Sequence, residues 1–184
     1  MKKIGTLLIF LALVVVCLVQ LPADAQAASE SDLTFKLRSD GQSYYVSACN
    51  SSASGELVIP STYNGKDVTS IGDDAFENCS RLTSVTIPDS VTVIGSSAFQ
   101  KCSALESMII PNSVVTIHGS AFADCESLQS VTIGNGVEVI GDYVFNDCYN
   151  LKSIVIPGSV KSIGMGAFDQ IKDIYNRPYR LVQS

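Results

Sequence analysis

Apolar residues recur every 23 positions along most of this chain. Six apolar columns keep this step without an insertion. The phenylalanine column contains Phe76, Phe99, Phe122, Phe145 and Phe168. Five further columns start at Ile71, Cys79, Leu82, Ile87 and Val91. A unit of this size is too small to bury its own apolar side chains, so consecutive units must stack and share one continuous core.

Each unit contains two extended segments. In the longer one, Val85 and Ile87 alternate with the polar Ser84 and Thr86. This period of two is typical of a strand with one face buried. A shorter extended segment over residues 91–94 follows.

Residues 96–102 then predict a short turn of helix. The side chain at the start of this turn is expected to accept hydrogen bonds from the first backbone N–H groups of its own turn. This side chain is Ser96, with Asp73 and Asp142 at the same place in other units. The predicted fold class is therefore an α/β repeat solenoid that is rich in β-structure. It is a right-handed superhelix of about five 23-residue coils, with parallel strands and short helical turns.

The ends of the array depart from the repeat, as solenoid caps do. Residues 28–68 predict an N-terminal cap, in which a hairpin with a two-residue turn at Asp40-Gly41 precedes a first degenerate repeat. Asn64-Gly65 predicts a second turn. Residues 69–170 hold the regular repeats, and residues 171–184 are expected to form a C-terminal cap.

Residues 1–27 differ in kind from the rest of the chain. Lys2 and Lys3 precede an apolar run over residues 4–21, and small residues follow Pro22. This order predicts a cleaved secretory signal peptide, with an uncleaved membrane anchor as the alternative, because the apolar run approaches spanning length.

Cleavage would remove two lysines and one aspartate, so the net charge of −6 would become −7. An acidic chain with no basic run is a poor partner for phosphate backbones. We therefore expect no nucleic-acid binding, and no membrane insertion after signal removal. The mature protein is expected to be secreted, with surface association through a partner as a further option.

Three runs make the repeat recognisable. They are LTSVTIPDSVTVIGSSAFQKCSAL, IPNSVVTIHGSAFADCESL and IPGSVKSIGMGAF. They closely resemble the BspA-type (Treponema pallidum-type) leucine-rich repeat, over about residues 55–174. The resemblance implies a surface-exposed or secreted protein of a host-associated bacterium that adheres to host or bacterial surface macromolecules. The chain departs from the pattern at Ile117-His118-Gly119, which interrupts the Ile-Gly step, and at Gly134, which replaces proline.

Five cysteines follow the predicted signal peptide, an odd count that leaves at least one thiol without an internal partner. They are Cys49, Cys79, Cys102, Cys125 and Cys148. Stacking would bring neighbouring members of the column close to disulfide range. The favoured interpretation is a ladder of buried free thiols, and pairing remains the alternative. Cysteines in a row cannot close a tetrahedron around zinc.

No constellation for catalysis is recognised, and we expect neither enzyme activity nor a cofactor or metal. His118 is the only histidine and is interpreted as an exposed turn residue. Asp124 and Asp147 share a column, which suggests a solvated acidic edge or, less simply, a weak calcium site.

The outward positions of the longer strands form the candidate binding surface. It consists of Ser84, Thr86, Ser107, Ile109, Ser130, Thr132, Ser153 and Val155, on the sheet expected to be concave. The predicted partner is an extracellular protein or glycan on a host or bacterial surface. The alternatives are a carbohydrate- or wall-binding module, which the absence of tryptophan disfavours, and a structural spacer from a longer repeat protein.

Overall fold

The computed structural model describes residues 27–171 and 173–176. The apolar run of the predicted signal peptide therefore lies outside the described residues. So does most of the predicted C-terminal cap.

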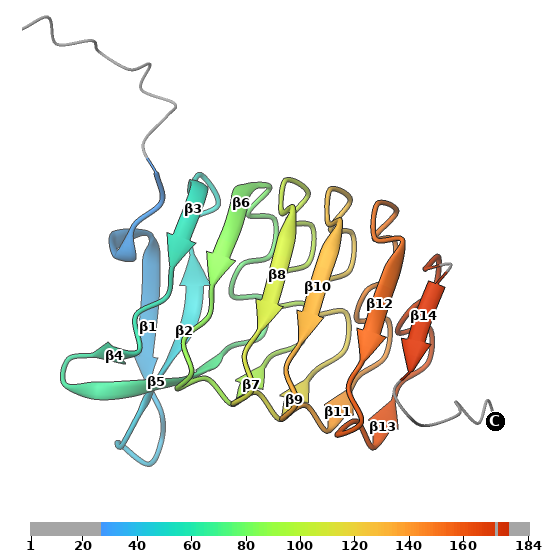
Figure 1. Ribbon diagram of the computed structural model, residues 1–184. Coiled ribbons are helices and arrows are strands. Elements are labelled where there is room, and N and C mark those ends of the chain that lie inside the picture. The colour runs from blue at the N-terminus through green and yellow to red at the C-terminus, as the bar shows by residue number, and fades with distance from the viewer. Residues whose placement is uncertain (1–26, 172, 177–184) are drawn as a thin grey trace, which may run out of the picture.

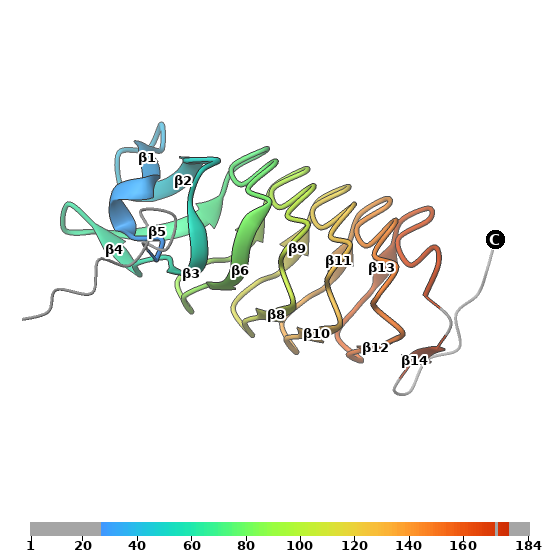
Figure 2. The same ribbon diagram turned by 90° about the horizontal axis from the view of Figure 1, so that it is seen from above.

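The described chain winds into coils that follow one another along a single axis (Figures 1 and 2). Longer strands lie along one side of the solenoid: β8 (Ser107–Ile110), β10 (Ser130–Ile133), β12 (Ser153–Ile156) and β14 (Asp173–Asn176) form one parallel sheet. They are preceded by a two-stranded parallel sheet of β3 (Ser54–Val58) and β6 (Arg81–Thr86). Short strands form the second side: β7 (Val93–Ile94), β9 (Thr116–Ile117), β11 (Val139–Ile140) and β13 (Ser162–Ile163). The predicted solenoid of parallel strands is confirmed.

A 3-10 helix, η2 (Glu30–Asp32), precedes an antiparallel hairpin at the start of the described fold. Strands β1 (Leu33–Leu37) and β2 (Tyr44–Cys49) pair with each other, and β2 also pairs in parallel with β5 (Lys66–Ile71). The turn between β1 and β2 is longer than the two residues predicted. The N–H of Arg38 donates to the carbonyl of Ser43, which leaves residues 39–42 in the loop. The Asp40 carboxylate accepts the N–H of Gln42 at 2.8 Å and so supports the wider loop.

The predicted turn at Asn64-Gly65 is confirmed. It joins β4 (Thr62–Tyr63) to β5 with Tyr63 opposite Lys66, so two residues make the turn. Asn64 has φ 48° and Gly65 has φ 74°. Two successive left-handed residues are the requirement of the type I′ turn, which Asn-Gly satisfies best.

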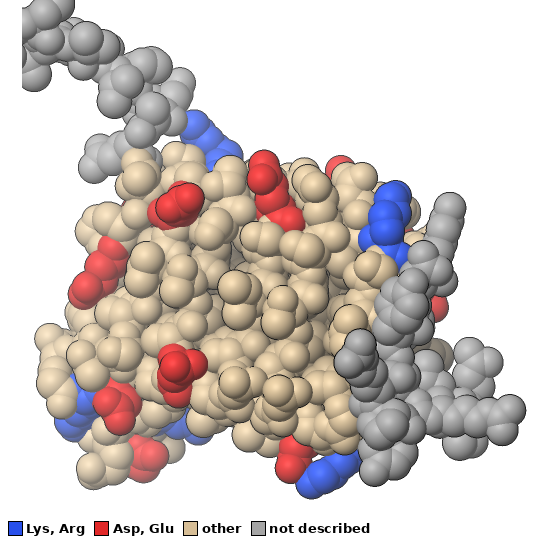
Figure 3. Space-filling model, viewed as in Figure 1, with Lys and Arg blue, Asp and Glu red and all other residues tan. Residues whose placement is uncertain are grey.

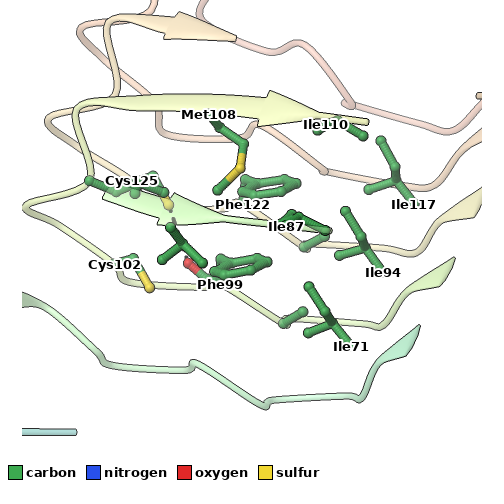
Figure 4. Close-up of a cluster of buried hydrophobic side chains, with 14 of the residues drawn as sticks. Ile71, Ile87, Ile94, Phe99, Cys102, Met108, Ile110, Ile117, Phe122 and Cys125 are labelled. Carbon is green, nitrogen blue, oxygen red and sulfur yellow. Dashed lines mark hydrogen bonds between the residues drawn. The ribbon is translucent and has the colours of Figure 1, made fainter. Parts of the chain in front are cut away.

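The phenylalanine column forms a continuous stack in the core. Phe76, Phe99, Phe122 and Phe145 are fully buried, and Phe168 is 9% exposed. Successive ring centroids lie 4.7, 5.1, 5.4 and 5.8 Å apart, with interplanar angles of 12° or less. Figure 4 shows Phe99 and Phe122 one above the other, beside the column of Ile71, Ile94 and Ile117. Equivalent side chains therefore share one dry interior.

The expected short helical turns are absent from the repeats, where the described chain forms non-helical turns. The reason is that backbone N–H groups bond between coils. Asp74, Phe76 and Asn78 donate to the carbonyls of Ser96, Ala98 and Gln100 in the next coil, at 2.7–2.9 Å. The following coil repeats these three bonds. A helix would need the same N–H groups for carbonyls within its own segment.

Two left-handed residues in each coil complete this departure from a helix. One column contains Asp74, Ser97, Ser120, Tyr143 and Gly166, and the other contains Asn78, Lys101, Asp124, Asp147 and Gln170. All ten have φ between 51° and 77°. Nine of them carry a Cβ, which the left-handed conformation disfavours by about 1–2 kcal/mol each. The inter-coil hydrogen bonds must hold these residues in place.

Two of the three predicted capping side chains act between coils instead of within one turn. Oδ1 of Asp73 accepts the N–H of Ser96, and Oδ1 of Asp142 accepts the N–H of Met165, each at 2.7 Å. In another column, the hydroxyls of Ser90 and Ser159 donate to carbonyls of the preceding coil, each at 2.7 Å. Short polar side chains therefore hold the coils in register.

Replacing Phe122 with alanine should lower the free energy of unfolding by about 3–5 kcal/mol, because a ring stacked on both sides leaves a cavity. Urea denaturation measures the change. Tyr149→Ala is the control, since Tyr149 is 56% exposed and its loss should change stability by only about 0.5 kcal/mol. Equal losses in the two variants would contradict the stacked core.

Replacing Lys101 with glycine should stabilise the fold by about 0.5–1 kcal/mol, because glycine adopts φ 61° without a Cβ clash. Lys101→Ala removes the same charge but keeps the Cβ, so it should give no such gain. Thermal unfolding of both variants tests the left-handed conformation. A gain in the alanine variant would assign the effect to the lost charge.

Candidate interaction surface

The eight residues predicted to face outward lie on one side of β6, β8, β10 and β12. Seven are exposed and Ser84 is half-buried. Ile109 is 70% exposed and Val155 is 51% exposed, whereas Met108 and Ile154 beside them in sequence are each 2% exposed. The period-two alternation thus separates core from surface on these strands.

Strand pairing arranges these residues in two rows. Ser107 lies opposite Ser130, and Ile109 opposite Thr132, which itself lies opposite Val155. One row therefore presents serine hydroxyls, and the other presents β-branched side chains. Thr86 continues the second row and pairs with a residue that the sequence analysis missed. This is Val58 of β3, which is 64% exposed. Residues 57–60 match the strand motif of residues 85–88, in which Thr86 faces outward. The outward position of Val58 could therefore have been predicted from the sequence.

None of the eight side chains is charged. Figure 3 shows this face in the orientation of Figure 1, with an uncharged middle and with acidic and basic side chains toward its margins. The surface offers hydroxyl groups and apolar methyl groups. It is chemically suited to non-covalent contact, through hydrogen bonds and burial of apolar area.

A groove of about 430 Å³ opens in this face between β10 and β12. Its lining includes Thr132 and Val155 from the predicted set, together with Val131, Ile133 and Pro157. Val131 is half-buried, although Met108 and Ile154, its counterparts in the neighbouring coils, are buried. The sequence analysis did not find this groove.

Weak pairing of the two strands accompanies the groove. Only Thr132 and Val155 are in register between β10 and β12, whereas β8 and β10 share four pairs. The turn after β10 also differs. A Cβ on Gly136 would lie 1.9 Å from the carbonyl oxygen of Asn112, so only glycine allows this close approach. The coil therefore lies close to its predecessor at this turn, while its strand keeps only one registered pair with the next strand.

Two tyrosines of the N-terminal cap, Tyr44 and Tyr63, pack on one another. Tyr63 stacks on Phe35 with a centroid distance of 4.2 Å, and Tyr44 meets Tyr63 edge-on at 5.1 Å. All three residues are partly buried against the core. These rings therefore stabilise the cap and do not form a flat, open aromatic platform.

The described cysteines are free, as the favoured interpretation held. Cys102, Cys125 and Cys148 are buried, and each Sγ donates to a phenylalanine carbonyl of the preceding coil at 3.1–3.2 Å. Burial raises the pKa of the Cys102 and Cys125 thiols, and nearby cysteine sulfurs add to the effect. Burial raises the pKa of Cys148 to about 12.

The other groups considered for chemistry lie apart from this face. His118 is exposed at its turn. Asp124 accepts a hydrogen bond from Gln100 at 3.2 Å, and Asp147 accepts one from Tyr149 at 2.8 Å. Within residues 27–171 and 173–176, no three His, Cys, Asp or Glu side chains gather as a metal site. Over the same ranges, no helix has the length and apolarity to span a membrane.

Comparison with known families agrees with this architecture. The model of the BspA type leucine-rich repeat region matches residues 46–175 in six copies. The chain belongs to this family. Leucine-rich-repeat proteins generally act as protein-interaction modules, and they are typically not enzymes. BspA-type members are commonly secreted or found at the cell surface.

Solved leucine-rich-repeat structures resemble the chain. A protein from T. pallidum is 29% identical with a TM-score of 0.75, and the match covers 81% of this chain and 71% of that protein. One from Bacteroides ovatus is 32% identical with a TM-score of 0.69, covering 78% of this chain and 39% of that protein. A cell surface protein from Faecalibacterium prausnitzii is 26% identical with a TM-score of 0.53, covering 82% and 54% respectively. No curated protein matches the chain.

In the folded BspA-type domain at pH 8, iodoacetamide should leave Cys102, Cys125 and Cys148 unmodified, because their thiols are buried and their raised pKa values keep them protonated. Peptide mass spectrometry measures the labelling. The same reaction in guanidinium chloride should label all three. Equal labelling rates in the folded and unfolded protein would contradict the buried ladder.

Proposed function

We propose that this protein is an exported module that binds an extracellular protein through the outer face of β6, β8, β10 and β12. The observation that carries the proposal is the pair of uncharged rows on consecutive strands, interrupted by the groove between β10 and β12. The partner would be a protein on a host or bacterial surface, and adhesion would be the biological role.

The geometry supports an extended contact. Parallel strands lie about 4.8 Å apart, so the rows present similar groups at regular intervals along the solenoid. Solenoids commonly use such surfaces to bind partners along their length. The groove adds a concave apolar position, where one side chain of a partner could be buried. Buried anchors of this kind carry most of the affinity in protein interfaces.

Export is supported by the pattern of residues 1–27 and by the family, whose members are commonly secreted or surface-exposed. The F. prausnitzii relative is itself described as a cell surface protein. In the proposed organisation, the signal peptide (1–27) precedes the N-terminal cap (28–68), the repeats (69–170) and the C-terminal cap (171–184).

The chemistry of the face favours a protein over a glycan. The rows provide methyl groups and hydroxyls, whereas binding through sugar rings would be favoured by open aromatic platforms. In the N-terminal cap, Tyr63 packs between Phe35 and Tyr44 instead.

Replacing Ser107, Ile109, Ser130 and Thr132 together with glutamate should weaken partner binding at least about 100-fold, because four charges would be buried in the interface. The natural chain is first tested on an array of extracellular-matrix and bacterial surface proteins, beside a glycan array. The affinity of the variant for any protein bound is then measured by surface plasmon resonance.

A matched control places four glutamates at exposed positions on the short-strand side: Thr92, Val115, Val139 and Ser162. It carries the same added charge and should bind like the natural chain. Circular dichroism must show that both variants are folded. Equal binding by the two variants would move the site to another surface, and binding to glycans alone would favour the carbohydrate-binding alternative.

A further inference from the structure

Cys49 and Cys79 meet where the N-terminal cap joins the first regular coil. Sγ of Cys49 donates to the carbonyl oxygen of Asn50 at 3.6 Å, and Sγ of Cys79 points to the same oxygen at 3.8 Å. The backbone is in contact as well, because the N–H of Cys49 donates to the carbonyl of Ala75 at 2.6 Å.

The pair differs from the rest of the ladder in two ways. Cys102, Cys125 and Cys148 each donate to a separate phenylalanine carbonyl at 3.1–3.2 Å, whereas Cys49 and Cys79 share one acceptor over longer distances. Cys49 is also half-buried, while the other four described cysteines are buried. A reagent in solvent can therefore reach this end of the ladder first.

The pKa values of the two thiols are shifted in opposite directions. The neighbouring Cys49 thiol lowers the pKa of Cys79, because a polar S–H group beside it stabilises the Cys79 thiolate. The proximity of Cys79, together with burial, raises the pKa of Cys49. The nearby Asp32 carboxylate opposes ionisation of both thiols. The pair thus loses its first proton more readily than a single thiol at the same depth would, and the remaining proton can move between the sulfurs.

We propose that Cys49 and Cys79 form a disulfide by exchange with a low-molecular-weight disulfide, while Cys102, Cys125 and Cys148 remain thiols. The bond ties the cap hairpin covalently to the first coil. Of the five described cysteines, one pair forms and three thiols remain in the dry ladder. It does not depend on the proposed binding function.

The exchange proceeds in two balanced steps. The Cys79 thiolate first takes the proton of the half-buried Cys49. The Cys49 thiolate then attacks one sulfur of the small disulfide and forms a mixed disulfide. The small thiolate released in this step takes the proton from Cys79. The Cys79 thiolate then attacks the Cys49 sulfur and releases the second small thiolate. The two protein protons end on the two small thiols, so the small disulfide is reduced as the protein pair is oxidised.

The test incubates the folded natural chain with oxidised glutathione, unfolds it in guanidinium chloride with iodoacetamide, and maps its peptides by mass spectrometry. The expected product is a cross-linked peptide joining Cys49 to Cys79, about 2 Da lighter than the two separate peptides. Cys102, Cys125 and Cys148 should carry the alkyl group. Dithiothreitol should reverse the cross-link.

The oxidised chain should also melt about 5–10 °C higher than the reduced chain, because the bond closes the long loop from residue 49 to residue 79. Cys49→Ser should form no cross-link and show no oxidant-dependent rise. Cys125→Ala should still link Cys49 to Cys79. A persistent glutathione adduct on Cys49, a cross-link within the other three cysteines, or unchanged melting despite the cross-link would overturn the proposal.

Discussion

The rest of the structure depends on the vertical stacking of equivalent side chains in successive coils. One coil cannot enclose an apolar core, but core side chains such as Phe122 and Ile117 are covered by their counterparts in the coils above and below. The rings stack at 4.7–5.8 Å, close to the ~4.8 Å spacing of paired strands, so side-chain packing and backbone pairing require the same rise per coil. Stability then accumulates through contacts between neighbouring coils, as in other solenoids.

This constraint explains why so many polar groups act between coils. Buried backbone groups must find partners, and a coil with no helix of its own finds them in the adjacent coil. Asp73, Asp142, Ser90 and Ser159 do the same with their side chains. Structural hydrogen bonding is thus met in the interior and at the turns.

The phenylalanine stack widens toward the C-terminal end of the array, and the groove lies in the same half of the solenoid. Ring separation increases from 4.7 Å at Phe76–Phe99 to 5.8 Å at Phe145–Phe168. Strands β10 and β12 keep only one residue pair in register, and the groove opens between them. At the opposite end, the hairpin cap brings Cys49 beside Cys79. Both features lie where two neighbouring coils do not match each other in structure.

The sequence by itself determined the repeat length, the identity of the core columns, the parallel strands and the outward positions, because these follow from a period that every coil repeats. The outward position of Val58 follows from the same alternation, although the degenerate first repeat made it harder to recognise. Only the tertiary structure decided the conformation of the turns, since Ser-Ser-Ala-Phe is locally compatible with a helix until N–H groups find acceptors in the next coil. The tertiary structure likewise decided which N–H groups donate to Asp73 and Asp142, where the groove beside Val131 opens, and that Cys49 meets Cys79. They depend on the offset between neighbouring coils, a three-dimensional quantity that no single repeat contains.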